Sequence, residues 1–288
     1  MPDIAVYNGE FTTLDQAKAP VNDRAFVFGD GIYEVVKVLH GKFFGLELHL
    51  DRLYRSAEGI ELALPWDRTA IAALLKEIYV RSGYRSALVY MQLSRGVHPR
   101  QHYFPPENTV PAVAAWATEF AGSPPALHAE GVSAVTVPDE RWAKCWIKSL
   151  NLLPNCMARN VARRAGAYEA ILVDRDGLVN ECSASNVFAV MNGVVRTAPR
   201  SRNILRGISR HVAIECALAA GIPLGEQAFS VPEMLAADEV FLTSTSPDVL
   251  GIVRVDGVKI GAGKPGPVTM RLLKLFRHYQ QTGEYQHG

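Results

Sequence analysis

A stretch of glycine, paired proline and small residues near the middle of the chain, GSPPALHAEG (122–131), interrupts the hydrophobic patterns on both sides of it. Residues of this kind break helical and strand periodicity alike, so the stretch is typical of a linker. The chain has 288 residues, 48% of them hydrophobic, which is enough for two ordinary cores. We therefore predict two domains, one at 1–121 and one at 132–288.

The N-terminal half alternates strand and helix patterns. A run rich in branched and aromatic residues at 32–44 contains His40-Gly41, which predicts a β-hairpin. The other expected elements are helices at 46–60 and 67–83 and strands at 87–96 and 111–120. The loop between these two strands is dense in proline and polar side chains that no core requires, and such loops often carry function.

The C-terminal half begins with strand patterns and ends with a helix pattern. Turn signals at Asp176-Gly177 and Asn192-Gly193 predict antiparallel strands within 169–197. A buried strand at 239–249 runs into a loop rich in hydroxyl side chains. The other expected elements are strands at 132–137 and in the segment up to Ile147, and helices at 151–166, 207–221 and 268–281.

Charge and cysteine content narrow the class of protein. The 30 basic and 29 acidic residues form no long runs of like charge, so the charge pattern does not indicate binding to nucleic acid or to a membrane surface. The four cysteines are irregularly spaced and form no CxxC pair, which argues against a zinc or disulfide framework. No signal-peptide pattern occurs, and no apolar run approaches about 18 residues. We therefore predict a cytoplasmic protein that acts on a small molecule.

Lys148 and Glu181 supply the strongest chemical signal. Lys148 lies in the apolar-flanked run IKSLNLLPN (147–155), and Glu181 begins ECSASNVF (181–188). A lysine at the end of an apolar strand can form a Schiff base, and a carboxylate can keep a pyridine nitrogen protonated. Each residue alone has an ordinary interpretation, because most lysines beside apolar residues extend to water. Together they match the two ends of a pyridoxal 5'-phosphate (PLP) site.

A phosphate seat is predicted further along the chain. The residues GIS at 207–209 open a predicted helix, whose first N–H groups and positive dipole end favour an anion, and the glycine permits close approach. Ser244 and Thr245 follow a buried strand and add hydroxyl donors, and Arg52 adds a positive charge. Capping residues and exposed arginines are commonplace, so each feature by itself indicates little.

Other motifs do not favour a different chemistry. His98 and His102 have the spacing of metal ligands on a helix, but Pro99 opposes that helix and no third ligand is evident, so we expect no metal. GDGIYE (29–34) lacks the third glycine of a dinucleotide loop, and GAGKPG (261–266) has proline where a phosphate-binding loop needs serine or threonine. The chain also lacks the GxSxG elbow of serine hydrolases.

Six blocks of sequence carry a resemblance to a known family. They are FGDGIYEVVKV, HLDRLYRSA, IKSLNLLPN, YEAILVDRDGLVNECSASNVF, ILRGISR and FLTSTSP. In order and spacing the chain resembles the class IV PLP-dependent aminotransferases, which include branched-chain and D-amino-acid aminotransferases and, as a cousin, aminodeoxychorismate lyase. The resemblance implies an α+β protein of fold type IV, with a small N-terminal α/β domain and a larger C-terminal domain built on a β-barrel-like sheet.

The resemblance also implies a role for each matching residue. Lys148 would hold PLP as an internal aldimine and would then move a proton between the substrate Cα and the cofactor. Glu181 would pair with the pyridine nitrogen, and Leu205 would pack against the ring. The residues implied at the phosphate are Arg52, Ile208, Ser209 and Thr245, with Ser244 nearby and Gly207 allowing close approach.

The substrate side depends on the loop RGVHPRQHYFP (95–105). Arg100 and His102 bracket one residue, so their side chains share a face in an extended segment, and a guanidinium can grip a carboxylate at two points. The pair resembles the Arg-X-His carboxylate trap of D-amino-acid aminotransferases, completed by a tyrosine that matches Tyr33. In that group the loop reaches into the active site of the partner subunit, which implies a homodimer.

The resemblance thus implies transfer of an amino group from a D-amino acid such as D-alanine to 2-oxoglutarate. A branched-chain L-amino-acid aminotransferase, an (R)-amine transaminase and aminodeoxychorismate lyase are the alternatives within the family, and a catalytically silent binder is the alternative outside it. Cys182 follows Glu181 where D-amino-acid aminotransferases usually carry glycine, and a cysteine there is similar to the lyases. Ser209 stands where threonine is common and keeps the hydroxyl group.

Overall fold

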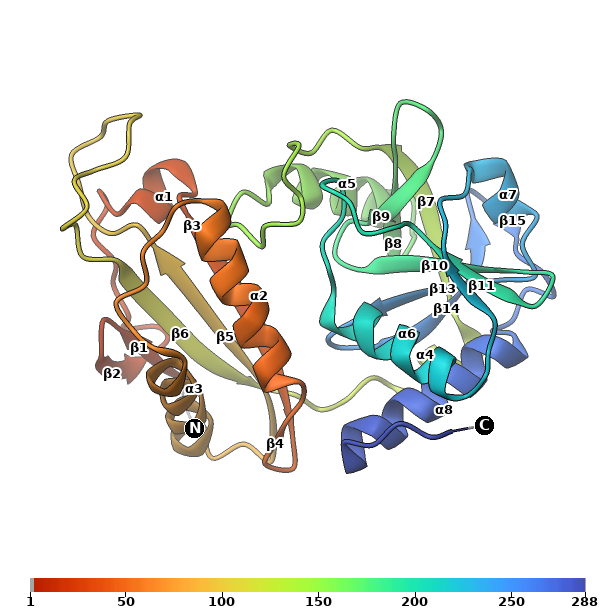
Figure 1. Cartoon of the computed structure of the whole chain (residues 1–288), viewed down its shortest axis with the longest axis horizontal. Helices are drawn as coiled ribbons and strands as arrows, with labels where there is room; N and C mark the ends of the chain where they lie inside the picture. The colour runs from red at the N-terminus through yellow and green to blue at the C-terminus, as the bar shows by residue number, and fades with distance from the viewer. Residues whose placement is uncertain (1–2, 288) are drawn as a thin grey trace. The chain divides into compact units, whose positions relative to one another are not determined.

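The computed structural model describes residues 3–287, which fold into two compact units (Figure 1). Unit 1 contains the chain up to Ala121 and the short segment Ile147–Leu152, and unit 2 contains Gly122–Trp146 and the chain from Leu153 onward. The sequence assigns all of 132–288 to the second domain. The structure differs for Ile147–Leu152, the segment that carries Lys148, because its backbone bonds to unit 1.

Unit 1 is built on a six-stranded antiparallel sheet in the order β2-β1-β6-β5-β3-β4. The predicted hairpin is confirmed, because β3 and β4 are joined at His40 and Gly41, whose φ values of 48° and 84° suit a tight hairpin turn. Its strands are β1 Ile4–Tyr7, β2 Glu10–Thr13, β3 Gly31–Leu39, β4 Lys42–Phe43, β5 Ser86–Ser94 and β6 Ala112–Glu119, and its helices are α1 Arg24–Phe28, α2 Leu46–Gly59 and α3 Arg68–Ser82.

Alternation along β3 separates two kinds of side chain. Ile32, Glu34 and Val36 are buried, and β3 packs against α2. Tyr33 and Val35 are half-buried. Successive side chains of a strand point to opposite faces of the sheet. The pattern therefore carries the carboxylate of Glu34 into the buried layer between the sheet and its helices, while Tyr33 lies on the other face.

Unit 2 contains a nine-stranded mixed sheet in the order β12-β11-β10-β13-β14-β7-β8-β9, with β15 paired to β14. Helices α6 and α8 pack against β13 and β14, and α5 packs against β7 and β8. Its elements are α4 Pro125–Glu130, β7 Val132–Pro138, α5 Leu153–Arg164, β8 Glu169–Val173, β9 Val179–Cys182, β10 Asn186–Met191, β11 Val194–Thr197, α6 Ile208–Ala219, β12 Leu224–Glu226, α7 Val231–Leu235, β13 Glu239–Ser244, β14 Asp248–Val255, β15 Val258–Lys259 and α8 Pro267–Thr282.

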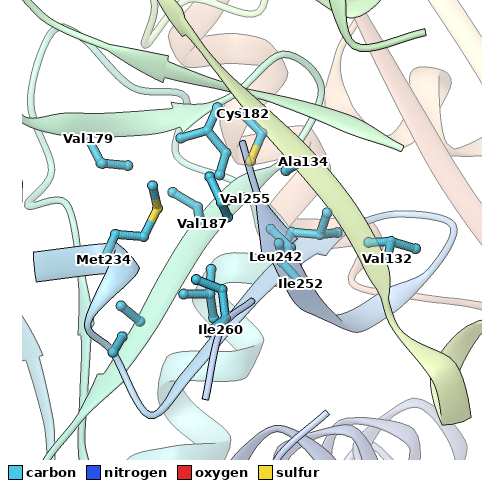
Figure 2. Close-up of a cluster of buried hydrophobic side chains, with 14 of the residues drawn as sticks. Val132, Ala134, Val179, Cys182, Val187, Met234, Leu242, Ile252, Val255 and Ile260 are labelled. Atoms are coloured by element: carbon cyan, nitrogen blue, oxygen red, sulfur yellow. The ribbon is translucent and has the colours of Figure 1, made fainter. Parts of the chain in front are cut away.

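The core of unit 2 gathers buried aliphatic side chains from these strands (Figure 2). Val179 and Cys182 both belong to it, although they lie three positions apart in β9. The register between β8 and β9 shifts at this point, since Ile171 pairs with Cys182 and Val173 pairs with Val179. An extra residue of this kind changes which side chains of a strand face the core.

Two expectations differ from the structure. The segment 139–147 contains turns and no strand, so the strand expected up to Ile147 is wrong beyond Pro138. The stretch 122–131 is not structureless, because it includes α4, which begins with proline at its first position and ends at Gly131. Within residues 3–287, no helix has the length and apolar character needed to span a membrane.

Candidate active site

The backbone around Lys148 is held against the start of β3. The Tyr33 N–H donates to the Lys148 carbonyl at 2.9 Å, and the Leu150 N–H donates to the Gly31 carbonyl at 3.0 Å. The Lys148 N–H donates to the hydroxyl group of Ser56 at 3.1 Å. The Lys148 side chain is half-buried, and its Nζ lies 4.1 Å from the centroid of the Tyr33 ring. The lysine is thus presented from an anchored segment beside an aromatic ring.

Two glycines allow this close approach. A Cβ at Gly31 would lie 2.4 Å from the Leu93 carbonyl oxygen and 2.8 Å from a methyl group of Leu150. Gly29 has a φ of 64°, and a Cβ there would lie 2.7 Å from the side-chain oxygen of Asn151. Larger residues would push the lysine segment away. The glycines of GDGIYE, which do not form a dinucleotide loop, thereby help to place Lys148.

Arg52 belongs to a buried cluster with Glu34 and His49. Its Nε donates to Glu34 Oε1 and its Nη2 donates to Glu34 Oε2, both at 2.7 Å. His49 Nδ1 lies 2.7 Å from Glu34 Oε2. A bidentate pair of this kind fixes the plane of a guanidinium. Arg52, which the sequence singles out for the phosphate, is therefore rigidly oriented by a carboxylate that the sequence does not single out.

The charges of this cluster determine its protonation. Burial raises the pKa of Glu34, but the adjacent charge and hydrogen bonds of Arg52, together with those of His49, hold that pKa well below its usual range. Burial lowers the pKa of His49 despite the attraction of Glu34. The cluster thus consists of an ionised Glu34, a charged Arg52 and a neutral His49, and its net charge is zero.

Arg100 and His102 contact the same aromatic ring in unit 1. The Arg100 guanidinium carbon lies 5.3 Å from the centroid of the Phe28 ring, and the His102 ring centroid lies 5.5 Å from it. Both side chains are exposed. Tyr33 packs on other groups, since its ring stacks with Tyr90 at 5.6 Å and carries Lys148 Nζ on its face. The structure thus groups Arg100 with His102, and Tyr33 with Lys148.

Glu181 lies in unit 2 with both carboxylate oxygens bonded. It accepts hydrogen bonds from Arg141 Nη1, from the Asn186 side-chain amide at 2.8 Å, and from the Leu205 N–H at 3.0 Å to each oxygen. The Asn186 amide also donates to the Leu205 carbonyl at 2.9 Å. Leu205, which the sequence assigns to the cofactor ring, is therefore tied through its backbone to the carboxylate assigned to the ring nitrogen.

Arg141 is shared between two carboxylates. Its Nε and Nη2 donate to the two oxygens of Asp139 at 2.9 Å and 2.7 Å, while Nη1 donates to Glu181. With both carboxylates ionised, the group of Asp139, Arg141 and Glu181 carries one uncompensated negative charge. Burial and this excess charge raise the pKa of Glu181 to about 7, although the charge of Arg141 acts against the rise. A cationic pyridine N–H would supply the missing positive charge, so these residues fit PLP.

The start of α6 fits a phosphate. Gly207 is the N-cap residue, no side chain caps the helix, and the first turn contains no acidic residue. Ile208 and Ser209 are buried in this first turn, where backbone N–H groups lack helical partners. A Cβ at Gly207 would lie 2.2 Å from the side-chain oxygen of Asn186. Asn186 therefore touches both the proposed phosphate seat and the carboxylate of Glu181.

Ser244 and Thr245 lie where β13 ends and the turn to β14 begins. Both are half-buried. Strand β13 pairs with β10, which begins at Asn186, and it packs against α6. Unit 2 thus arranges Glu181 and the predicted phosphate residues other than Arg52 around neighbouring strand ends and one helix N-terminus.

Cys182 does not share the polar surroundings of Glu181. Only 1% of its side chain is exposed, and it belongs to the hydrophobic cluster of unit 2 (Figure 2). Burial raises the pKa of the Cys182 thiol well above its usual value. A neutral, buried thiol behaves as a small apolar side chain. The position of Cys182 therefore supplies packing and no group for the chemistry at Glu181.

Five residues contribute to the site although the sequence analysis assigns them no role. Glu34 and His49 orient Arg52, Asp139 and Arg141 set the charge at Glu181, and Asn186 links Glu181 to Gly207. Glu34, His49 and Asn186 do lie inside three of the six family blocks, near Tyr33, Arg52 and Glu181, whereas Asp139 and Arg141 lie outside all six. Among residues 3–287, no group of three or more His, Cys, Asp or Glu side chains has an arrangement that could hold a metal ion.

Comparison with known proteins identifies the family. Residues 31–255 match the family described as amino-transferase class IV, and this match covers more than half of the chain. The chain is a class IV aminotransferase. Enzymes of this class depend on PLP and act on amino acids and 2-oxo acids, and the same holds for this aminotransferase.

Similar proteins match the aminotransferase over nearly its whole length. It is 41% identical to the D-alanine aminotransferase of Listeria innocua over 270 residues, 93% of each chain. It is 40% identical to the D-alanine aminotransferase of Staphylococcus aureus over 273 residues, 94% of this chain and 96% of that one. The branched-chain amino acid aminotransferase from Escherichia coli has a TM-score of 0.90 at 26% identity, covering 99% of this chain and 96% of that chain.

A further solved structure is similar to the same extent. A branched-chain amino acid aminotransferase from T.th., solved with pyridoxamine 5'-phosphate, has a TM-score of 0.90 at 26% identity and covers 97% of this chain and 94% of that chain. These likenesses confirm the predicted fold type IV, with a curled mixed sheet in the C-terminal part.

Proposed function

We propose that this aminotransferase transfers the amino group of a D-amino acid, such as D-alanine, to 2-oxoglutarate. The observation that carries the proposal is the pairing of Arg100 with His102 against Phe28, which offers two adjacent donors to a substrate carboxylate. The D-alanine aminotransferases that are 40% to 41% identical to the chain support the same substrate class.

PLP, when bound, supplies an electron sink that stabilises negative charge at the substrate Cα. Lys148 is proposed as the amine that carries the cofactor and, once released by the substrate, moves a proton to and from Cα through its Nζ. The hydrogen bonds that fix its backbone leave the side chain able to swing, while the Tyr33 ring limits its path. Removal of the amine would abolish both steps.

Glu181 is proposed to hold a proton on the pyridine nitrogen. Its bonds to Arg141, Asn186 and Leu205 fix the carboxylate, and the shared charge of Arg141 leaves it short of one positive partner. A protonated nitrogen provides that partner and strengthens the electron sink. Arg141 and Asp139 are thus proposed to adjust how strongly Glu181 attracts the proton.

The phosphate is proposed to bind at the N-terminus of α6 through the backbone of Gly207, Ile208 and Ser209. The hydroxyl groups of Ser244 and Thr245 would add donors, and Arg52, oriented by Glu34, would add its guanidinium group. No acidic residue in the first turn of α6 opposes an anion there. Leu205 is proposed to pack against the cofactor ring.

Arg100, His102 and Tyr33 are proposed to bind the carboxylate of the substrate. The exposure of Arg100 and His102 leaves them accessible to a ligand. We infer a homodimer in which the loop 95–105 serves the active site of the partner subunit, as the family resemblance implies. Size determination in solution should give twice the chain mass of 31.5 kDa.

A branched-chain L-amino-acid aminotransferase is the second candidate, because the solved structures with TM-scores of 0.90 carry that name. The decisive experiment adds D-alanine or L-leucine to the purified holoenzyme and follows the absorbance of the bound cofactor. D-Alanine should deplete the band and yield pyruvate, and L-leucine should act far more slowly. Depletion by L-leucine and not by D-alanine would refute the proposal in favour of the second candidate.

A further inference from the structure

Arg24 joins the loop that carries Arg100 and His102 to the body of unit 1. It is 3% exposed, although it belongs to a helix of only one turn, α1. Its Nη1 donates to the carbonyl of Gln101 at 2.8 Å, and its Nε donates to Asp30 Oδ2 at 2.7 Å. Gln101 is the residue between Arg100 and His102. One buried guanidinium therefore bonds the peptide that separates the two proposed carboxylate-binding side chains.

Asp30 holds Arg24 in place and is itself fixed. Besides Arg24, it accepts hydrogen bonds from Arg95 Nε at 2.9 Å and 3.1 Å. Arg95 also donates to the carbonyl groups of Ile60 and Glu61 at 2.5 Å and 2.8 Å, at the end of α2. The second arginine of the cluster is thus bonded to the helix layer, whereas Arg24 extends the cluster to the middle of the loop.

The ring of Phe28 forms a second link between Arg24 and the loop, because side chains from both contact it. The guanidinium carbons of Arg24 and Arg100 lie 4.7 Å and 5.3 Å from the centroid of its ring, and the His102 ring contacts it as well. Cation–π contacts of this geometry favour a guanidinium over a ring face. The exposed side chains of Arg100 and His102 therefore rest on a ring of α1, and the backbone between them is bonded to a side chain of α1.

We propose that Arg24 is a positioning residue for substrate carboxylate recognition, and that it acts by fixing the Gln101 carbonyl so that Arg100 and His102 hold a common orientation. The proposal rests on the proposed function of those two residues. Arg24 itself does not touch the substrate. Its loss would disorient the loop and weaken carboxylate binding, while Lys148 and Glu181 would keep their own surroundings.

The planar fork of arginine is essential to this role. Nε and Nη1 of Arg24 bond two different partners at once, the Asp30 carboxylate and the Gln101 carbonyl. Lysine has the same charge but a single ammonium group, which cannot reproduce a rigid fork. Arg24→Lys should therefore keep the ion pair with Asp30 and lose the bond to the loop. The substitution separates charge from geometry without leaving a buried carboxylate unpaired.

The test compares Arg24→Lys with Arg95→Lys and wild type, all as holoenzymes. Arg95→Lys makes the same change in the same ion cluster, but its lost hydrogen bonds lead to Ile60 and Glu61. The Arg95 guanidinium also lies 3.7 Å from the ring centroid of the loop residue Phe104, and lysine keeps a cation for that ring. For Arg24→Lys we expect KM for D-alanine and the inhibition constant of propionate to rise about tenfold or more, with kcat within about threefold of wild type. Amide hydrogen exchange should quicken in 97–104 alone. Arg95→Lys should keep both constants within about twofold.

The outcomes separate this inference from the proposed function. If wild type uses D-alanine and Arg24→Lys matches it in KM, propionate inhibition and exchange of 97–104, the positioning role is wrong and the proposed function stands. Equal effects in both variants would assign Arg24 a general structural role and also overturn the inference. If wild type does not use D-alanine, the proposed function fails and the inference fails with it.

Discussion

Glu34 in unit 1 and Glu181 in unit 2 are both deeply buried carboxylates bonded to an arginine, yet their pKa values move in opposite directions. The pKa of Glu34 is lowered, whereas the pKa of Glu181 is raised to about 7. Glu34 receives both nitrogens of Arg52 and a histidine, while Glu181 shares Arg141 with Asp139. The balance of charges in each cluster, and not burial alone, explains the difference.

This difference suits two tasks. A neutral cluster keeps Arg52 in one orientation at all ordinary pH values, which is what a fixed phosphate ligand requires. A cluster with one negative charge in excess attracts a cation, which is what a pyridine N–H provides. Under the proposed function, the Glu34 carboxylate is structural and the Glu181 carboxylate is complementary to the cofactor.

The largest expected effect is on catalysis. Glu181→Gln has a neutral amide that cannot hold a proton on the pyridine nitrogen, so kcat for D-alanine transamination should fall about a thousandfold, or about 4 kcal/mol of transition-state stabilisation. Glu34→Gln, the matched change in the other cluster, should lower kcat far less. Similar losses of kcat in both variants, measured with saturating PLP, would contradict the different roles proposed for Glu34 and Glu181.

The next effect is on folding. Glu34→Gln leaves the buried guanidinium of Arg52 without its anion, so the free energy of unfolding should fall by about 3 kcal/mol or more. The control Glu77→Gln removes an exposed ion pair with Arg81 on α3 and should cost about 0.5 kcal/mol or less. Urea unfolding of the apoenzymes measures both. A Glu34→Gln variant as stable as Glu77→Gln would show that Arg52 does not depend on Glu34.

Glu181 should also give the apoenzyme a characteristic pH dependence. Its folded pKa of about 7 lies above the usual 4.5, so the folded state favours the protonated form. The resulting stability is fully present below pH 4.5 and is lost as the pH rises through 7, a change of about 3 kcal/mol. Glu181→Gln should lack this loss. Unfolding curves of the two apoenzymes between pH 4.5 and 8 that stay parallel would contradict the raised pKa.

The smallest expected effect concerns the shared arginine. Asp139→Asn removes the competing carboxylate, leaves Arg141 to Glu181 alone, and should lower the pKa of Glu181. The acidic limb of the pH profile of kcat should shift to lower pH in the same direction. An unchanged pH profile would show that Asp139 does not affect the pKa of Glu181. The Glu181 cluster would then behave as a simple carboxylate–arginine pair, as the Glu34 cluster does.

Much of the fold could be predicted from local pattern. Helices α2, α3, α6 and α8 follow their apolar spacing, and the hairpin of β3 and β4 follows from His40-Gly41. The strand prediction for 139–147 was wrong because branched and aromatic residues favour strands, whereas the bonds of Arg141 to Glu181 and to the Asn203 carbonyl tie this segment of turns to distant parts of unit 2.

From the sequence, site residues could be predicted only where a single residue or a short motif has a recognisable chemical role. Lys148 and Glu181 have recognisable chemistry, and 207–209 opens a helix with a glycine. Glu34 meets Arg52 from 18 positions away, and Arg141 meets Glu181 from 40 positions away. No local pattern marks such pairs, because they arise only when strands and helices pack. The partners that set the charge of each cluster therefore required the structure.

Titration of Glu181 without and with PLP measures whether this carboxylate lacks a positive partner that the cofactor supplies. Carbon-13 NMR of glutamate-labelled enzyme follows the titration, and the Glu181 signal is assigned by its loss in Glu181→Gln. We expect the Glu181 carboxylate to titrate near pH 7 in the apoenzyme and at clearly lower pH once PLP is bound, because the pyridine N–H supplies the missing positive charge. A titration near pH 7 that PLP leaves unchanged would contradict this expectation.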